Sequence, residues 1–191
     1  MAAQVDVLTA GYVGERVASS VTLIRDGDAT VVVDPGMVAS RDKILAPLLD
    51  LGVDPESVTD VVFSHHHPDH TINAALFGRA RVHDFWAIYA DDVWTNRLVV
   101  DHPDGWSLSE SVRLLATPGH SDQDISTLVE TAGGLVVCTH VWWTERGPAA
   151  DPRGASEADL HASRSKLLAL QPALVIPGHG AAFVPSGQTP R

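Results

Sequence analysis

The sequence predicts a single α/β domain, and three features of its pattern support this. Short β-branched runs dominate the first third, and strand-like and helix-like segments alternate after it. The chain has 191 residues, which is about the length of one domain. No linker is long enough to divide it, so residues 1–191 are expected to form one unit with a disordered tail from about residue 185.

The first predicted elements are strands, followed by a helix. Residues 5–10 alternate between apolar and polar side chains, as a half-buried strand does. Residues 21–24 and 30–33 are β-branched runs on either side of an Asp-Gly turn, which predicts a hairpin. Residues 40–51 carry an apolar stripe with helical spacing, and Ser40 is the expected N-cap.

The middle of the chain predicts shorter elements. A buried strand over residues 61–63 leads into a polar segment, after which a helix is expected to begin at Pro68 and to continue to about Phe77. Further short strands are expected around residues 81–83 and 112–115. The tryptophan-bearing stretch between these two strands is expected to be irregular.

The last third repeats the order of strands and then a helix. Residues 125–129 and 135–139 predict a second hairpin across a Gly-Gly pair. Residues 145–155 are expected to form a surface loop, and a capping-box pattern opens a helix over residues 156–170. A final buried strand is expected over residues 173–176.

Composition argues against several classes of protein. Thirteen Lys+Arg against 24 Asp+Glu give a net charge of −11, which argues against a broad phosphate-binding face and a nucleic-acid partner. A single cysteine, Cys138, excludes an internal disulfide and a Cys-based zinc cluster. No apolar run approaches the roughly 18 residues of a membrane span, and the N-terminus shows no signal-peptide pattern. We therefore expect a cytoplasmic protein with no membrane partner.

The sharpest local pattern is His-His-His-Pro-Asp-His over residues 65–70, directly after an apolar strand. Residues two apart in an extended segment point the same way, so His65 and His67 can face one metal ion. The helix that follows aims Asp69 and His70 back at the same place, where the helix dipole favours a carboxylate. The pattern therefore predicts a metal site whose histidines bind in their neutral form.

Three further histidines follow strand-like segments, and each is a candidate ligand. His120 and His179 each follow a Pro-Gly pair, which lets the backbone turn sharply, and His140 ends an apolar run. Loops at strand ends are where an α/β scaffold carries its chemistry. We therefore expect His120, His140 and His179 to join the cluster at residues 65–70.

The order of these motifs resembles the metallo-β-lactamase superfamily. The resemblance rests on His-x-His-x-Asp-His, then Pro-Gly-His, a residue after a late apolar strand, and Pro-Gly-His-Gly. It covers residues 5–183. Within the superfamily, the chain is similar to small metallo-β-lactamase domain-containing hydrolases, also in residues 82–85. It implies a four-layer αβ/βα sandwich, in which two mixed β-sheets are flanked by helices and a zinc-type site lies at the sheet edge.

The resemblance also implies a role for each motif residue. It places Asp34 behind the ligands as a partner or as a turn former. It implies two metal positions, the first held by His65, His67 and His120 and the second by Asp69, His70 and His179.

His140 departs from this pattern, because the family usually carries a metal-bridging Asp at that position. An imidazole offers one lone pair and no negative charge, whereas a carboxylate has two oxygens and can bridge. Two arrangements stay open. Either His140 binds one metal terminally and a water or hydroxide is the only bridge, or the site holds one ion tightly and a second weakly or not at all. Zinc, as one or two ions, is the expected metal, and iron and manganese stay open.

We expect a metal-dependent hydrolase in which a metal-bound hydroxide, held by Asp69, attacks a small ester, thioester, lactone or amide. No motif for another nucleophile is present. The alternatives are a phosphodiesterase or nuclease of the same superfamily, and a catalytically silent metal-binding protein on this fold. The sequence leaves open a homodimer, and whether Trp142 and Trp143 line the pocket or pack in the core.

Overall fold

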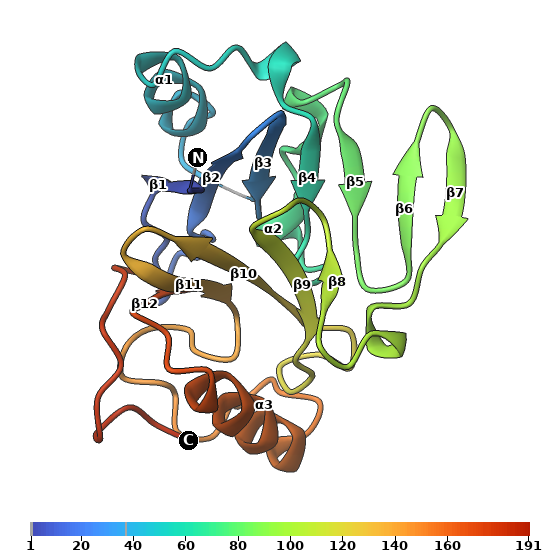
Figure 1. Ribbon diagram of the computed structural model, residues 1–191. Helices are drawn as coiled ribbons and strands as arrows, with labels where there is room; N and C mark the ends of the chain where they lie inside the picture. Colours follow the sequence, from blue (N-terminus) through green and yellow to red (C-terminus); the bar gives the residue numbers. More distant parts are fainter. Residues whose placement is uncertain (1, 37) are drawn as a thin grey trace.

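A computed structural model describes residues 2–36 and 38–191 and shows two β-sheets packed face to face with helices outside them (Figure 1). The N-terminal half of the chain forms one sheet and the C-terminal half forms the other. This arrangement confirms the predicted α/β sandwich.

In the described chain the first sheet has seven strands, and their order in the sheet is their order in the sequence. β3 is parallel to β4 and β4 to β5, whereas the other neighbours are antiparallel, so the sheet is mixed. The strands are β1 (Gln4–Thr9), β2 (Val21–Asp26), β3 (Ala29–Val33), β4 (Asp60–Val62), β5 (Arg81–His83), β6 (Ala87–Ala90) and β7 (Val93–Asn96).

The second sheet of the described chain has five strands in the order β12-β11-β10-β9-β8. β11 and β12 are parallel and the other neighbours are antiparallel. The strands are β8 (Trp106–Ser107), β9 (Val112–Ala116), β10 (Ile125–Thr131), β11 (Gly134–Thr139) and β12 (Leu174–Pro177).

Alternation along the strands divides the apolar side chains between the core and the outer helices. Val31 and Val33 of β3 pack in the core between the sheets, together with side chains such as Leu114 and Val129 from the second sheet. Val32 points to the other face, where a helix covers it. Burial of both faces explains why this strand reads as a continuous valine run.

Two longer helices cover the outer faces of the sheets. α1 (Asp42–Asp50) packs its apolar stripe on the first sheet, and α3 (Glu157–Ala169) buries Leu160 and Leu167 against the second. The oxygen of Ser156 accepts a hydrogen bond from the Asp159 backbone N–H, as the predicted capping box requires. The short α2 (Pro68–Thr71) lies near the sheet edge, and 3-10 turns span Pro55–Ser57, Ala74–Leu76 and Val99–Asp101.

Two predicted helix boundaries are corrected. The helix from Pro68 ends at Thr71 rather than near Phe77, because Asn73 turns away and hydrogen bonds through its side chain to the carbonyl of Gly36. The N-cap of α1 is Arg41, one residue after the predicted Ser40. The hydroxyl of Ser40 accepts a hydrogen bond from the backbone N–H of Asp42, the first residue of α1.

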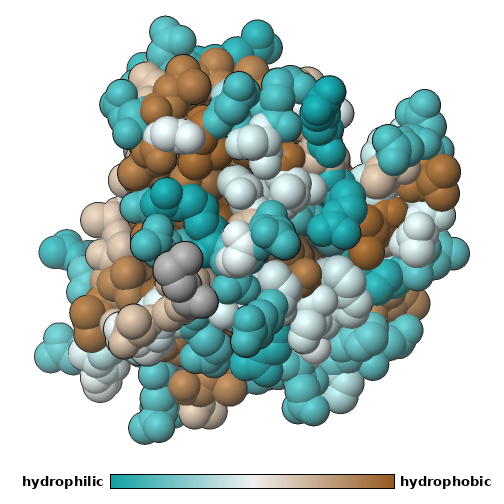
Figure 2. Space-filling view, turned by 45° about the horizontal axis from the view of Figure 1, so that its top comes forward, coloured by the Kyte–Doolittle hydropathy of each residue, from teal (hydrophilic) through white to brown (hydrophobic). Residues whose placement is uncertain are grey.

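The stretch expected to be irregular contains a hairpin of β6 and β7. Asp91 and Asp92 both have positive φ, 50° and 64°, which is the backbone of a tight primed turn. The hairpin projects from the sandwich, and Figure 2 shows apolar side chains on this projection. Val93 and Trp94 are among the exposed apolar residues there.

The C-terminal tail packs against the domain, which corrects the expectation of disorder from about residue 185. The indole N–H of Trp142 donates to the Pro190 carbonyl at 2.8 Å, and Thr189 is buried. Among the residues that the structure describes, no helix has the length and apolar character needed to cross a membrane.

Candidate metal centre

The predicted ligands come together at one edge of the sandwich, where four strands end. β9 and β11 are both antiparallel to β10, and β12 is parallel to β11, so these three strands run in the same direction. His120, His140 and His179 follow their ends, and residues 65–70 follow the end of β4 in the facing sheet. The fold therefore brings candidate ligands from both sheets to one place.

Buried carboxylates behind two of the imidazoles set their orientation. His70 Nδ1 donates to Asp34 Oδ2 at 2.9 Å, and His120 Nδ1 donates to Asp151 Oδ2 at 2.7 Å. An ionised carboxylate can only accept, so it assigns the proton of each ring to Nδ1 and leaves a lone pair on Nε2. Each ring therefore presents Nε2 as a ligand atom.

Two more rings have partners on their outer sides. His179 Nδ1 donates to the Ala18 carbonyl at 2.7 Å, which leaves its Nε2 as an acceptor. His65 Nδ1 lies 3.0 Å from Ser64 Oγ and 3.8 Å from Asp124 Oδ1. The protein thus fixes the inward direction of these rings from behind.

Asp34 ties the ends of two strands to this centre. It has a φ of 52°, in the left-handed region that residues other than glycine adopt infrequently, Asp and Asn more than most. Its Oδ1 accepts from the Ser64 backbone N–H at 2.7 Å, while its Oδ2 accepts from His70. Asp34 therefore has both roles that the resemblance implied, turn former and partner of a candidate ligand.

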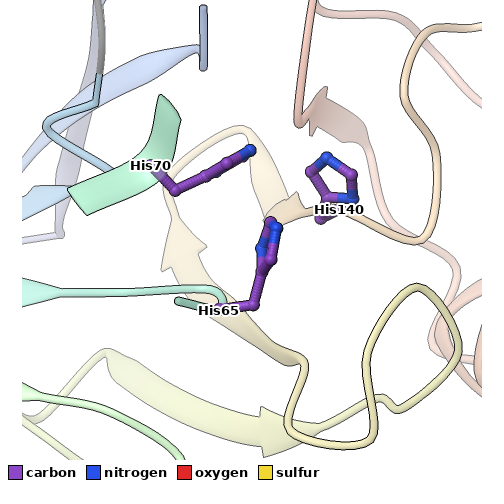
Figure 3. Close-up of side chains that lie close together, drawn as sticks. All are labelled: His65, His70 and His140. Atoms are coloured by element: carbon purple, nitrogen blue, oxygen red, sulfur yellow. The ribbon is translucent and has the colours of Figure 1, made fainter. Parts of the chain in front are cut away.

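Three sets of side chains in the described chain have ligand atoms within 4.8 Å of one another. Two of them are the sets that the resemblance implied. The third consists of His65, His70 and His140 (Figure 3). The three sets are His65–His67–His120, Asp69–His70–His179 and His65–His70–His140.

The donor atoms at this edge fit a divalent transition-metal ion. His67 Nδ1 lies 2.8 Å from His65 Nε2 and 3.0 Å from His120 Nε2, so inward-facing nitrogens crowd together. Within the described chain, His70 Nε2 and His140 Nδ1 are buried without a hydrogen-bond partner. Buried lone pairs without a donor are costly, and imidazole nitrogens suit zinc and iron, so a cation satisfies the arrangement.

Burial also keeps several of these imidazoles in the neutral form. It lowers the pKa of His65 and His140 well below 6.5, with neighbouring imidazoles adding to the effect. Burial likewise lowers the pKa of His120 and His179. Burial raises the pKa of Asp124 to about 7.

Acid is expected to destabilise the metal-free protein. The unfolded chain protonates these histidines near pH 6.5, whereas the fold keeps them neutral, so the unfolded state binds more protons as the pH falls. Each of His65, His120, His140 and His179 can contribute up to about 1.4 kcal/mol per pH unit below 6.5. Asp124 acts in the opposite sense, since its raised pKa lets the fold hold one extra proton.

The four histidines outweigh the single carboxyl group of Asp124, so the free energy of unfolding decreases on acidification. The free energy of unfolding, measured by urea denaturation in the presence of a chelator, is expected to fall steadily from pH 7 to pH 5. A value that stays level or rises over this range contradicts the neutral assignment of the cluster.

Asp151 lies behind a candidate ligand, and sequence reasoning missed it. Its Oδ2 accepts from His120 Nδ1 and from the Trp143 indole N–H at 2.8 Å, and its side chain is only 3% exposed. The loop that carries it is held by Arg164, which donates to the carbonyls of Pro148 and Ala149 in the loop and to the carbonyl of Val141 at its start. One Asp in a polar loop gives no sequence signal of such a contact.

The two tryptophans after β11 divide between core and cavity. Trp142 is fully buried and packs beneath α3 with Leu160. Trp143 lines a cavity of about 1020 Å³ that opens over the candidate ligands. Arg16, Arg153 and Glu15 also line this cavity, so its wall combines an aromatic surface with charged side chains of both signs.

Replacing Asp151 by asparagine is expected to weaken zinc binding by about 10- to 100-fold, the usual effect of losing a carboxylate behind a metal-bound histidine. The amide keeps the size of the side chain but lacks the charge that favours the inward lone pair of His120. Zinc affinity would be measured by competition with a chromophoric chelator. Asp122→Asn, an exposed position nearby, is the matched control. Equal affinities for the two variants would rule out this role.

Comparison with known proteins identifies relatives over most of the chain. The family model of the metallo-beta-lactamase superfamily matches residues 14–179. Metallo-beta-lactamase domain-containing protein 1 of Xenopus laevis is 36% identical over 172 residues, which are 86% of this chain and 71% of that protein. The chain spans a smaller share of the rat protein of the same name, 62% of its length, at 35% identity.

Solved structures share the fold at lower identity. A candidate metallo-beta-lactamase from Thermotoga maritima matches with a TM-score of 0.72 and 22% identity, over 97% of this chain and 100% of that one. An N-acyl homoserine lactone hydrolase, with a product bound at its catalytic metal centre, matches with a TM-score of 0.66 and 16% identity. That match covers 94% of this chain and 92% of the lactone hydrolase.

Proposed function

Because the chain belongs to the metallo-β-lactamase superfamily, we propose that it is a metal-dependent hydrolase of a small ester, thioester, lactone or amide. The observation that carries the proposal is the convergence of inward-facing imidazole nitrogens and Asp69 beneath an open cavity. His65, His67 and His120 would hold one ion, and Asp69, His70 and His179 a second. We take zinc as the metal, because the donors are mainly imidazole nitrogens.

The cation supplies two kinds of chemistry when it is bound. It would lower the pKa of a water ligand to about 7 and would polarise the oxygen of the scissile group. The residues of this chain do the positioning. Asp34, Asp151 and the Ala18 carbonyl hold three ligand rings by their outer nitrogens, so the inward nitrogens need no rearrangement before they bind.

Asp69 is the proposed catalytic residue. Its Oδ2 lies 3.5 Å from His70 Nε2 and 3.8 Å from His179 Nε2, and its side chain is 19% exposed toward the cavity. A carboxylate in this position can accept a hydrogen bond from the attacking water and orient it toward the substrate. Trp143 contributes an apolar wall to the cavity beside the site.

Small-molecule substrates fit the cavity and charge better than long nucleic acids. The cavity is of the size that takes a small ligand, and the net charge of −11 repels a polyanion. The lactone hydrolase with the same fold acts on an acyl homoserine lactone, as its name states, which supports lactones as one class to test. Phosphodiesters stay in the comparison because Arg16 and Arg153 line the cavity.

The test is a substrate panel with the zinc-loaded protein. Acyl homoserine lactone, 4-nitrophenyl acetate, an acyl thioester and bis(4-nitrophenyl) phosphate would be compared before and after chelation. We expect turnover of at least one carbonyl substrate, its loss with chelator, and its return with zinc. Asp69→Asn should remove it, whereas Asp159→Asn on the exposed face of α3 should not. Stoichiometric zinc with no turnover in any class would instead support a silent binding protein.

A further inference from the structure

His140 differs from the other buried imidazoles of the centre in how it is held. His70, His120 and His179 each donate through Nδ1 to an oxygen behind the ring. His140 Nδ1 is buried and has no hydrogen-bond partner among the described residues. Its ring is held by packing, because it occupies the space that a side chain on Gly178 would fill. On its other side, His140 Nε2 lies 3.2 Å from His179 Nε2, which can only accept because His179 Nδ1 donates to Ala18. The proton of His140 is therefore on Nε2, and Nδ1 keeps a lone pair without a partner.

His140 completes a ligand set that lies between the two expected metal positions. His65, His70 and His140 come from different segments, after β4, in α2 and after β11, and their imidazoles point into a shared space (Figure 3). All three side chains are almost fully buried, at 1%, 0% and 2% exposure. Their ring centroids lie 4.2 to 4.7 Å apart.

This third set cannot be filled together with the other two. His65 also belongs to the set with His67 and His120, and His70 belongs to the set with Asp69 and His179. In each case the outer nitrogen of the ring has a partner, so one nitrogen remains for one ion. An ion in the central set therefore uses His65 and His70, which the flanking sets also need. Two ions in the flanking sets would leave only His140 for the central set.

The missing carboxylate favours the central position for the first ion. With imidazole at residue 140, Asp69 is the one carboxylate among the three ligand sets, so little negative charge offsets two neighbouring dications. His67, in contrast to the central three, is exposed and must lose side-chain freedom when it binds. The central rings are already ordered and out of water.

We propose that His65, His70 and His140 form a central site that takes the first divalent transition-metal ion, and that this state excludes the two-ion arrangement. The inference rests on the proposed metal-dependent function and specifies how that centre fills. Three imidazoles with no carboxylate favour zinc, cobalt or ferrous iron over magnesium or calcium. The protein would therefore bind one ion tightly, and would take two only after the central ion has moved.

The test compares the dissociation constant of the first zinc ion among alanine variants. His140→Ala should weaken it at least tenfold, because only the central set contains this residue. His120→Ala and His179→Ala, which disrupt one flanking set each, should leave it within threefold of the unchanged protein. His161→Ala, a half-exposed histidine on α3, is the matched control. Thermal melts of each metal-free variant would verify that it is folded.

A measurement on the unchanged protein gives the same answer without relying on the folding of variants. At one equivalent of zinc, side-chain nitrogen NMR should show metal-bound signals for His65, His70 and His140 and unbound signals for His120 and His179. Metal-bound signals from His120 or His179 at that point, or a first ion weakened by their removal, would overturn the central site while leaving the hydrolase proposal intact. A protein that binds no zinc at all would refute both.

Discussion

Alanine in place of His65 is expected to lower kcat/KM of the metal-dependent reaction by at least about 1,000-fold, a loss of roughly 4 kcal/mol of transition-state stabilisation. His65 belongs to two of the three ligand sets, so its loss removes a donor from the central position and from one flanking position. Its side chain is 1% exposed, and no neighbouring side chain can take its place without repacking. Zinc content after dialysis should fall together with the activity.

His66→Ala is the control, because it makes the same change one residue further along the chain. His66 points away from the ligands and lies 3.2 Å from Asp84 Oδ2, with its side chain 41% exposed. Its activity and zinc content are expected to stay within about twofold of the unchanged protein, since surface substitutions have small effects. Comparable losses in both variants would show that the His65 effect comes from disturbance of the loop and not from a lost ligand.

Gly36→Ala is expected to destabilise the fold by more than about 3 kcal/mol, beyond the usual cost of overpacking. A Cβ at this position would overlap the backbone carbonyl of Asp69 and crowd the hydroxyl of Ser19. Both neighbours are fixed, because the Ser19 N–H donates to the Asp69 carbonyl at 3.1 Å and Ser19 Oγ donates to the Asp34 carbonyl at 2.8 Å. The segment that carries Asp69 must therefore shift.

Thermal unfolding would measure this cost as a fall in Tm of roughly 6–12 °C for a chain of this length. Gly78→Ala provides the comparison, because a Cβ there meets nothing within 4 Å. Its Tm is expected to change by less than about 2 °C. If Gly36→Ala melts like Gly78→Ala, the close approach of the two segments is wrong.

The candidate metal centre could be anticipated from sequence because each of its parts follows a strand. The His-x-His spacing, Asp69 and His70 after β4, and the later histidines after β9, β11 and β12 are local signals. Strands that run in the same direction end at the same edge, so the pattern needed no side-chain detail to bring them together. The structure places all seven of these side chains at that edge, while their binding of metal remains a prediction.

Other features depended on contacts that leave no local signal. Asp151 contacts His120 from a loop that Arg164 of α3 holds in place by hydrogen bonds to three backbone carbonyls. The β6–β7 hairpin depends on two consecutive Asp residues adopting positive φ, which is uncommon for residues other than glycine. The C-terminal tail looked unstructured by composition, and its one strong anchor is the indole of Trp142. In each case tertiary contacts decided the outcome.

Every one of the three ligand sets draws residues from both halves of the sandwich. The segment after β4 supplies His65, His67, Asp69 and His70 on one side, and each set adds a single histidine that follows a strand of the other sheet. A bound ion would link the two sheets across their interface, and this link would be lost when the ion dissociates. Each tenfold rise in free ion above its Kd would add about 1.4 kcal/mol to the resistance of the fold to unfolding, so metal supply would also govern how long the protein survives a protease.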